Sequence, residues 1–320
     1  MRVVYENDTW EFRGEKFPYM HIAFRDDEYD EQFTTTESDT VCYEQVTNQY
    51  REKYGIPYTD EIIAVRGRYG ISAAKMSLIL GIGVNQYRLY EQGEVPSVSN
   101  GRMIRSVMNP KVMLEMVESS RNELSDPDYD KITAKVKAVI ADGEAYKLTR
   151  YETMRVFSTP RGADNGYAQL SLNRLKNVIL YILNRCNDVW ITKMNKLLFY
   201  VDFMSYRELG MAITGLTYRA IDFGPVPERW DRVYSEFPEV TQELCRGGDC
   251  VGSVLTTSAQ ADESLFSEKE RQVMDAVCSR LGSDTSSEIV SLSHSESAWR
   301  NHYEQHERIP FIEAFGLKSI

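Results

Sequence analysis

The segment from residue 59 to residue 107 constrains the fold most strongly, because its apolar residues follow helical spacing in four short runs. Glycine or proline separates the runs, at Gly70, at the turn Gly81–Gly83 and between Gly93 and Pro96. Helices of two or three turns are marginal alone, so this pattern predicts a bundle of packed helices. The expected helices begin near Thr59, Ser72, Val84 and Ser97 or Ser99.

The second and third of these helices are joined by a glycine-containing turn, which is typical of a helix-turn-helix motif. The third helix would then enter the major groove of DNA with polar side chains near its start. Asn and Gln pair with adenine and Arg with guanine, so the predicted DNA contacts are Asn85, Gln86, Tyr87 and Arg88. Lys75 and Arg102 are predicted to contact phosphates. The alternative is a bundle in which the glycines serve only the turns.

The charge distribution favours the same segment as the one that meets DNA. The chain has 37 basic and 48 acidic residues, a net charge of −11, which argues against a polybasic nucleic-acid binder. Residues 59–109 nevertheless carry 6 basic and 4 acidic side chains, net +2, whereas residues 1–58 carry −7 and residues 173–320 carry −5. Non-specific affinity for phosphate is therefore expected to be modest, and binding would depend on base contacts and dimerisation.

Two strings, L-G-I-G-V-N over residues 80–85 and Y-E-Q-G-E-V-P over residues 90–96, resemble the Xre-like DNA-binding domain of MqsA-type antitoxins. The resemblance implies that Asn85 reads operator DNA, and helix-turn-helix proteins commonly do so as dimers. The family's second reading residue, an arginine four positions later, falls on Leu89, and Arg88 points about 100° away on an ideal helix. The operator is therefore expected to differ from the family's usual sequence.

Composition and periodicity divide the chain into four parts, and the fold is expected to be mainly α with an α+β C-terminal domain. Strand alternation around Arg13–Lys16 predicts an N-terminal hairpin, and residues 158–171, rich in Gly, Ser and Asn, are expected to be a linker. The predicted parts are a hairpin and helix at 1–54, a helix-turn-helix domain at 55–109, a helical connector and linker at 110–172, and the α+β domain at 173–320.

In MqsA-type antitoxins a small zinc module with two C-x-x-C pairs often precedes the DNA-binding domain. Here Asp26 and Tyr29 stand where the second pair would be, and no cysteine precedes Cys42. Structural zinc needs four Cys or His ligands, so the resemblance implies a degenerate module that folds without metal. A module this small would have to pack on a neighbouring domain or chain. The alternative is an unrelated pair of strands.

The C-terminal part carries the string K-L-L-F-Y-V-D over residues 196–202, then T-G at 214–215 and G-P-V at 224–226. These motifs resemble the Panacea domain, also called the SocA-like antitoxin domain, over roughly residues 173–315. The resemblance implies an antitoxin that binds and neutralises a cognate protein toxin encoded beside it. An alternative within the same resemblance is an adaptor that delivers the toxin to a protease.

Residue types in this part permit two interpretations of its aromatic side chains. Aromatic residues often supply the strongest contacts at protein interfaces, which would make them a toxin-binding patch, and core packing is the other interpretation. A strand at 218–223 is expected to end at Gly224–Pro225, with a helix at 227–237. The candidate toxin contacts are Tyr200, Asp202, Tyr206, Tyr218 and Trp230.

No recognisable constellation of catalytic residues occurs, so the chain is not expected to be an enzyme, and no cofactor or metal is predicted. A hydrolase with an unrecognised site in the C-terminal part is the alternative of another class. No apolar run is long enough for a membrane span, and the N-terminus lacks a secretory pattern. The five cysteines are scattered along the chain, which fits reduced thiols better than disulfides. We therefore expect a cytoplasmic, homodimeric antitoxin that neutralises its toxin through the C-terminal domain and represses its own operon.

Overall fold

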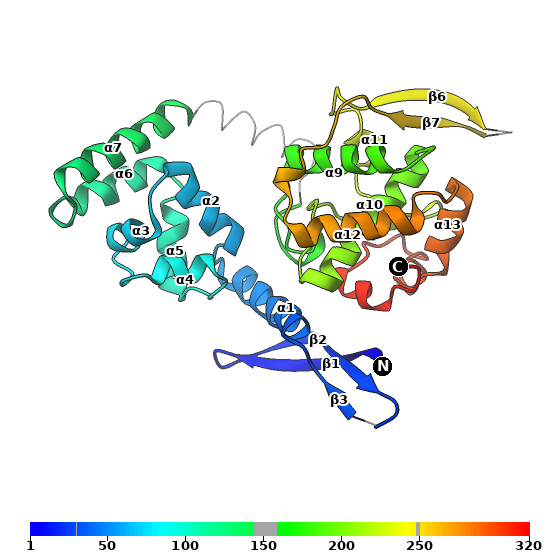
Figure 1. The fold of residues 1–320 in the computed structure, drawn as a ribbon, viewed down its shortest axis with the longest axis horizontal. Helices are drawn as coiled ribbons and strands as arrows, with labels where there is room; N and C mark the ends of the chain where they lie inside the picture. The colour runs from blue at the N-terminus through cyan, green and yellow to red at the C-terminus, as the bar shows by residue number, and fades with distance from the viewer. Residues whose placement is uncertain (30, 144–158, 248–249) are drawn as a thin grey trace. The chain divides into compact units, whose positions relative to one another are not determined.

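The computed structural model describes residues 1–29, 31–143, 159–247 and 250–320. This part of the chain is mainly helical, with three small antiparallel sheets (Figure 1), as the sequence predicts. Packing divides the chain into two units, Met1–Val46 with Thr153–Ile320 and Thr47–Glu152. The N-terminal hairpin therefore belongs with the C-terminal part and not with the helical bundle. No helix within the described ranges is long and apolar enough to cross a membrane.

The N-terminal sheet is a long hairpin with a short third strand, in the order β1 (Arg2–Phe12), β2 (Glu15–Asp26) and β3 (Glu31–Phe33). Both residues of its turn, Arg13 and Gly14, have positive φ, at 53° and 81°. Turns of this kind match the right-handed twist of the strands they join, which explains why a two-residue connection suffices. The predicted hairpin is confirmed.

Side-chain contacts hold the hairpin to α1 (Thr36–Tyr54) and to the end of the chain. The Met20 N–H donates to Gln45 Oε1 at 2.9 Å, and Gln45 Nε2 donates to the Met20 carbonyl at 3.0 Å. On β1, the ring of Tyr5 lies 5.4 Å from the ring of Phe315, centroid to centroid. The rest of the first unit thus supplies the packing surface that an isolated hairpin lacks.

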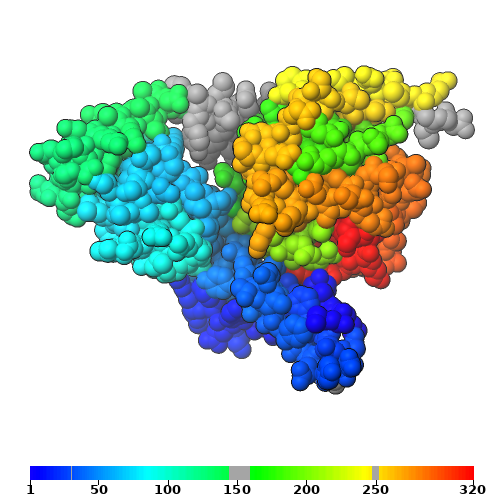
Figure 2. Space-filling view, viewed as in Figure 1, coloured from blue at the N-terminus to red at the C-terminus, as the bar shows by residue number. Residues whose placement is uncertain are grey.

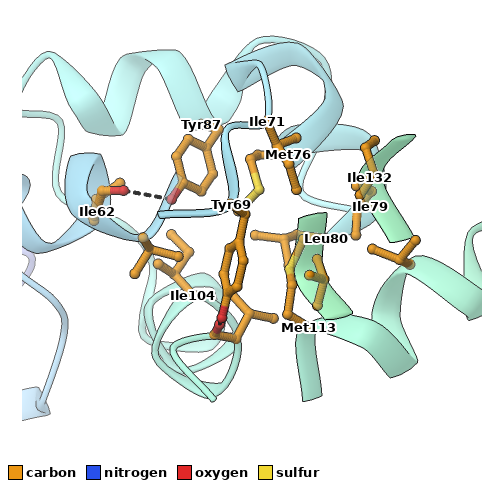
Figure 3. Close-up of a cluster of buried hydrophobic side chains, with 14 of the residues drawn as sticks. Ile62, Tyr69, Ile71, Met76, Ile79, Leu80, Tyr87, Ile104, Met113 and Ile132 are labelled. Carbon is orange, nitrogen blue, oxygen red and sulfur yellow. Dashed lines mark hydrogen bonds between the residues drawn. The ribbon is translucent and has the colours of Figure 1, made fainter. Parts of the chain in front are cut away.

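The second unit is a helical bundle around one apolar core, part of which is drawn in Figure 3. The four expected helices contribute to this core, and so do Met113, Val117, Ile132 and Val136. Residues 110–141 are therefore part of the bundle and not the connector that the sequence predicts. Its helices are α2 (Thr59–Tyr69), α3 (Ala73–Ile79), α4 (Gln86–Glu91), α5 (Val98–Ser106), α6 (Pro110–Ser119) and α7 (Asp126–Ala141), with the 3₁₀ helix η1 (Arg121–Glu123).

Capping residues set the ends of the short helices. Gly70 ends α2 in the left-handed conformation, and Ser72 Oγ accepts from the Lys75 N–H at the start of α3. Asn85 precedes α4 with a φ of 63°, a conformation that asparagine tolerates better than most side chains. Residues 80–85 therefore form a tight connection between α3 and α4.

The C-terminal part is built around α10 (Ile191–Leu209), in which every residue from Lys193 to Phe203 is buried. The helices α12 (Glu268–Leu281) and α13 (Ser286–Ser295) pack against α10, and Figure 2 shows α12, in orange, on the face turned to the viewer. The other elements are η2 (Ala163–Asn165), α9 (Leu172–Arg185), β4 (Tyr218–Ile221), β5 (Gly224–Pro227), α11 (Trp230–Val233), β6 (Thr241–Gly247), β7 (Cys250–Thr256), η3 (Glu263–Leu265), α14 (Ser297–Arg300) and η4 (Phe311–Gly316).

Three details of this part differ from the sequence prediction. Gly224–Pro225 does not stop a strand but begins β5, which pairs antiparallel with β4; proline is acceptable there because β5 is an edge strand. The helix expected at 227–237 is only the single turn α11. Within the expected linker, Asn165 and Tyr167 are buried, so residues 163–168 belong to the packed unit. Residue 158 of that linker lies outside the described residues.

Candidate functional site

Asn85 and Arg88 are predicted DNA contacts that the structure leaves accessible. Both are exposed, and neither side chain bonds to another described residue. Leu89, where the resemblance to MqsA-type domains predicts an arginine, is 42% exposed, and Val84 is 90% exposed. This face of α4 thus offers an amide, a guanidinium and apolar groups, which are the groups that can contact base edges and thymine methyls.

Tyr87 does not belong to this face, which corrects the prediction that it contacts DNA. Its ring is fully buried, its hydroxyl donates to the Ile62 carbonyl at 2.7 Å (Figure 3), and its N–H donates to Ser77 Oγ at 3.0 Å. Tyr87 therefore anchors α4 to α2 and α3. Gln86 is half-buried, and its Nε2 donates to Glu94 Oε1 at 3.0 Å.

Of the two predicted phosphate contacts, Arg102 is exposed and has no side-chain partner among the described residues. Lys75 forms an ion pair with Asp128. The hydrogen bond from Lys75 lowers the pKa of the Asp128 carboxyl. The other arginines of the basic block are bonded within the bundle: Arg66 to Glu91, Arg68 to the Met108 carbonyl and Arg105 to the Gly55 carbonyl. Arg88 and Arg102 are therefore the arginines of this block whose guanidinium groups are not committed internally.

Asp202 lies at the centre of a buried hydrogen-bond network on α10. Its Oδ1 accepts from the N–H groups of Ile213 and Thr214 at 2.9 and 2.8 Å. Its Oδ2 accepts from the Thr214 hydroxyl and from the Tyr218 hydroxyl, the latter at 2.6 Å. Burial raises the pKa of the Asp202 carboxyl, and these hydrogen bonds act in the opposite direction. The network therefore links residues 213–218 to α10 through hydrogen bonds.

Tyr200 and Tyr206 are also interior residues. The Tyr200 hydroxyl lies 3.5 Å from Glu296 Oε1, and the ring of Tyr206 lies 5.5 Å from that of Phe311, centroid to centroid. Together with Asp202 and Tyr218 they are buried, so four of the five predicted toxin contacts cannot meet a partner without local unfolding. The core interpretation is therefore correct for the three tyrosines.

Lys196, within the string K-L-L-F-Y-V-D, is fully buried and its amine has no hydrogen-bond partner among the described residues. Burial lowers the pKa of this amine to about 7. Gly224 lies against it: a Cβ there would stand 2.6 Å from Lys196 Cε and 2.7 Å from Ser293 Oγ. His294 Nε2 is likewise buried without a partner, and burial, with Lys196 nearby, lowers the pKa of that imidazole. Sequence reasoning assigned this cluster no role.

Trp230 is the remaining predicted toxin contact, and it is 41% exposed. It borders a cleft of about 370 Å³ that we call the Trp230 cleft. Buried Leu216 and Val226 contribute apolar lining, and Glu228 and Arg229 contribute charged groups. Arg229 could not be singled out from the sequence, because only the fold places it at this cleft.

Asp26 and Tyr29, which the sequence resemblance places at zinc-ligand positions, have other surroundings in the structure. Asp26 Oδ1 accepts from the Glu28 N–H at 2.9 Å, which stabilises the loop after β2, and Tyr29 is exposed. Among the residues that the structure describes, no three His, Cys, Asp or Glu side chains are grouped as metal ligands would be.

Comparison with known proteins bears on the C-terminal part. No curated protein and no solved structure matches the chain. The segment that does match a family begins within α10, includes the Asp202 network, Lys196 and most of the Trp230 cleft, and ends with α14. Residues 194–300 match the family model described as Antitoxin SocA-like, Panacea domain, which identifies a Panacea antitoxin domain in this segment.

Proposed function

We propose that this chain is the antitoxin of a toxin–antitoxin system. It neutralises a cognate protein toxin by direct binding through the C-terminal part, and it represses its own operon by binding operator DNA as a homodimer. The Panacea domain at residues 194–300 is the observation that carries the antitoxin assignment. The operator-binding assignment rests on the exposed face of α4 and on the positive charge of its segment.

Neutralisation by contact, without catalysis, fits the placement of the polar groups in the C-terminal part. All four hydrogen bonds of Asp202 come from its own chain, so this carboxylate has little capacity left to act on a substrate. Lys196 is enclosed and does not line the Trp230 cleft. Exposed Trp230, in contrast, is the kind of side chain that anchors a protein partner.

Operator binding is supported by the local structure around Asn85. Its left-handed backbone conformation places it at the start of α4, and its side chain makes no capping hydrogen bond, so the amide is available to a base. Arg88 offers a guanidinium one turn later. Two copies of this face in a homodimer would read two half-sites of an operator.

Two measurements on the full chain test the proposal. Size-exclusion chromatography with the protein encoded beside this chain's gene should give a stable complex of fixed stoichiometry. Mobility-shift titration with the upstream promoter should show that Asn85→Ala and Arg88→Ala each weaken specific binding by roughly 5- to 100-fold, the equivalent of 1–3 kcal/mol. The exposed-lysine control Lys111→Ala should leave it within about twofold. Absence of a complex would refute neutralisation by contact, and unchanged operator affinity in both variants would refute the assignment of α4.

A further inference from the structure

We propose that the Trp230 cleft is the place where this domain holds the toxin, and that it takes a toxin segment in which a carboxylate stands next to a large apolar side chain. The inference rests on the proposed neutralising function and adds to it the surface and the chemistry of recognition. Four independent features of the cleft support it: its size and lining, an arginine whose side chain makes no hydrogen bond among the described residues, its backbone geometry and its exposed aromatic residues.

The cleft has the size and lining of a site for a side chain of a partner. Its volume of about 370 Å³ falls at the lower end of the range typical of binding pockets. Buried Leu216, Val226 and Pro227 form apolar lining, and partly buried Leu170 and Ile221 add to it. An apolar side chain placed there would be removed from water, which favours binding by roughly 25 cal/mol per Å² of apolar surface.

Most charged groups at the cleft are already hydrogen-bonded, and one arginine is held only by a longer ion pair. Glu228 accepts from Arg219 at 2.6 Å and from two nitrogens of Arg308 at 3.0 Å each, and Arg308 also bonds to Asp164 at 2.7 Å. Burial acts to raise the pKa of Glu228, but these hydrogen bonds lower it overall. The Arg229 side chain makes no hydrogen bond among the described residues, but its Nε forms an ion pair with Asp231 Oδ1 at 3.7 Å, beyond hydrogen-bond distance. A guanidinium in this state can bind an incoming carboxylate through two parallel hydrogen bonds.

The backbone holds Arg229 in an unusual conformation. Its φ is 66° and its ψ 28°, a left-handed conformation that costs free energy for an arginine, and it directly precedes α11. The preceding residue is fixed, because the Glu228 N–H donates to the Thr217 carbonyl at 2.8 Å. The fold thus maintains a strained residue at the edge of the cleft, and strain of this kind is concentrated at binding and catalytic sites.

Exposed aromatic side chains indicate that the occupant is a protein rather than a small carboxylate. Trp230 borders the cleft, and its indole N–H has no acceptor among the described residues. Phe223, on the turn after the cleft residue Ile221, is 67% exposed. Arg229 is exposed at the cleft, and its positive charge favours a carboxylate of the partner at this point. A partner surface that covers both rings would exceed a small ligand in extent.

The test uses the full chain and the purified protein encoded beside its gene. Calorimetric titration compares the wild type with Arg229→Gly and Trp230→Ala. Glycine accepts the φ of 66° without strain, so Arg229→Gly removes the guanidinium and leaves the backbone conformation favourable. Each variant should bind the toxin at least 10-fold more weakly, and binding by Arg229→Gly should depend less on salt than binding by the wild type.

The matched controls are Leu244→Ala on β6 and Arg280→Ala on α12, which remove an exposed apolar and an exposed charged side chain outside the cleft. Both should bind within twofold of the wild type. Unchanged affinity in both cleft variants, with a wild type that binds, would overturn the inference and leave the antitoxin function intact. Absence of binding by the wild type would overturn both.

Discussion

The Tyr218 hydroxyl donates to Asp202 Oδ2 at 2.6 Å, inside a site from which solvent is excluded. A buried carboxylate is costly unless it is fully hydrogen-bonded, and here two backbone N–H groups after α10 and the Thr214 hydroxyl supply the other donors. Thr214 of the T-G pair and Tyr218 thus both donate to Asp202, the last residue of K-L-L-F-Y-V-D. The three motif residues form one hydrogen-bond network in the domain interior.

Removal of one donor from this network should destabilise the protein without affecting toxin binding directly. Tyr218→Phe should lower the free energy of unfolding by about 1.5–3 kcal/mol, the usual contribution of a hydrogen bond to a charged group. Urea denaturation measures the change, and calorimetry at 25 °C should show an unchanged toxin affinity. A variant of normal stability that no longer binds toxin would show that Tyr218 is a contact residue after all.

Lys196→Met should stabilise the protein at neutral pH, because it replaces an unpartnered buried amine by an apolar side chain of similar length. The pKa of the amine falls from its ordinary value of 10.5 to about 7 on folding, a shift that corresponds to roughly 5 kcal/mol at most. Between these two pH values the unfolded chain holds the proton that the folded chain has released, so wild-type stability rises with pH.

The advantage of Lys196→Met should therefore be greatest below pH 7 and should decrease by about 1.4 kcal/mol per pH unit from pH 7 to pH 9. Urea denaturation of both proteins at several pH values measures this difference. A constant difference across that range would mean that the amine keeps its ordinary pKa in the folded protein.

Leu89→Arg tests how the face of α4 reads DNA. The change supplies the arginine that the sequence resemblance predicts at this exposed position, and an arginine there can pair with guanine. Selection from randomised DNA should give a different preferred site for the variant than for the wild type, with guanine favoured at one additional position. Identical selected sites would indicate that residue 89 faces away from the bases.

The N-terminal hairpin should be stabilised by its packing and should not require a metal. Gln45→Ala removes two hydrogen bonds to the backbone of Met20, so it should lower the free energy of unfolding by about 1–3 kcal/mol. A chelator should leave the melting temperature of the wild type unchanged. A decrease in melting temperature on chelation, reversed by zinc, would contradict this account of the hairpin.

The sequence predicts those elements whose ends are set by local chemistry. Gly70 and Ser72 mark helix ends in the chain and in the structure, and the turn at Arg13–Gly14 follows from a glycine between two alternating strands. The apolar residues of α10 also follow helical spacing in the sequence, but this spacing does not show that every residue from Lys193 to Phe203 is buried.

Features that depend on distant partners could not be predicted in this way. The position of Tyr87 near the start of α4 predicts a DNA contact, yet the carbonyl of Ile62 accepts from its hydroxyl and allows full burial. Residues 163–168 looked like a linker, but Gly166 permits close packing against Ala212 and Phe311, where a Cβ would stand 2.7 and 2.9 Å away. The place of Arg229 at the cleft likewise depends on contacts that the fold creates. Arg219 and Arg308 donate to Glu228, so Glu228 does not pair with Arg229.

The growth of cells that express the adjacent toxin, with and without this chain, tests the central claim most directly. The wild type should restore growth, and so should the double variant Asn85→Ala/Arg88→Ala when it is expressed from an unrelated promoter, because neutralisation does not require operator binding. The toxin should remain abundant in the rescued cells, since it is held and not degraded. Failure of the wild type to restore growth, or rescue accompanied by loss of the toxin, would contradict neutralisation by direct binding.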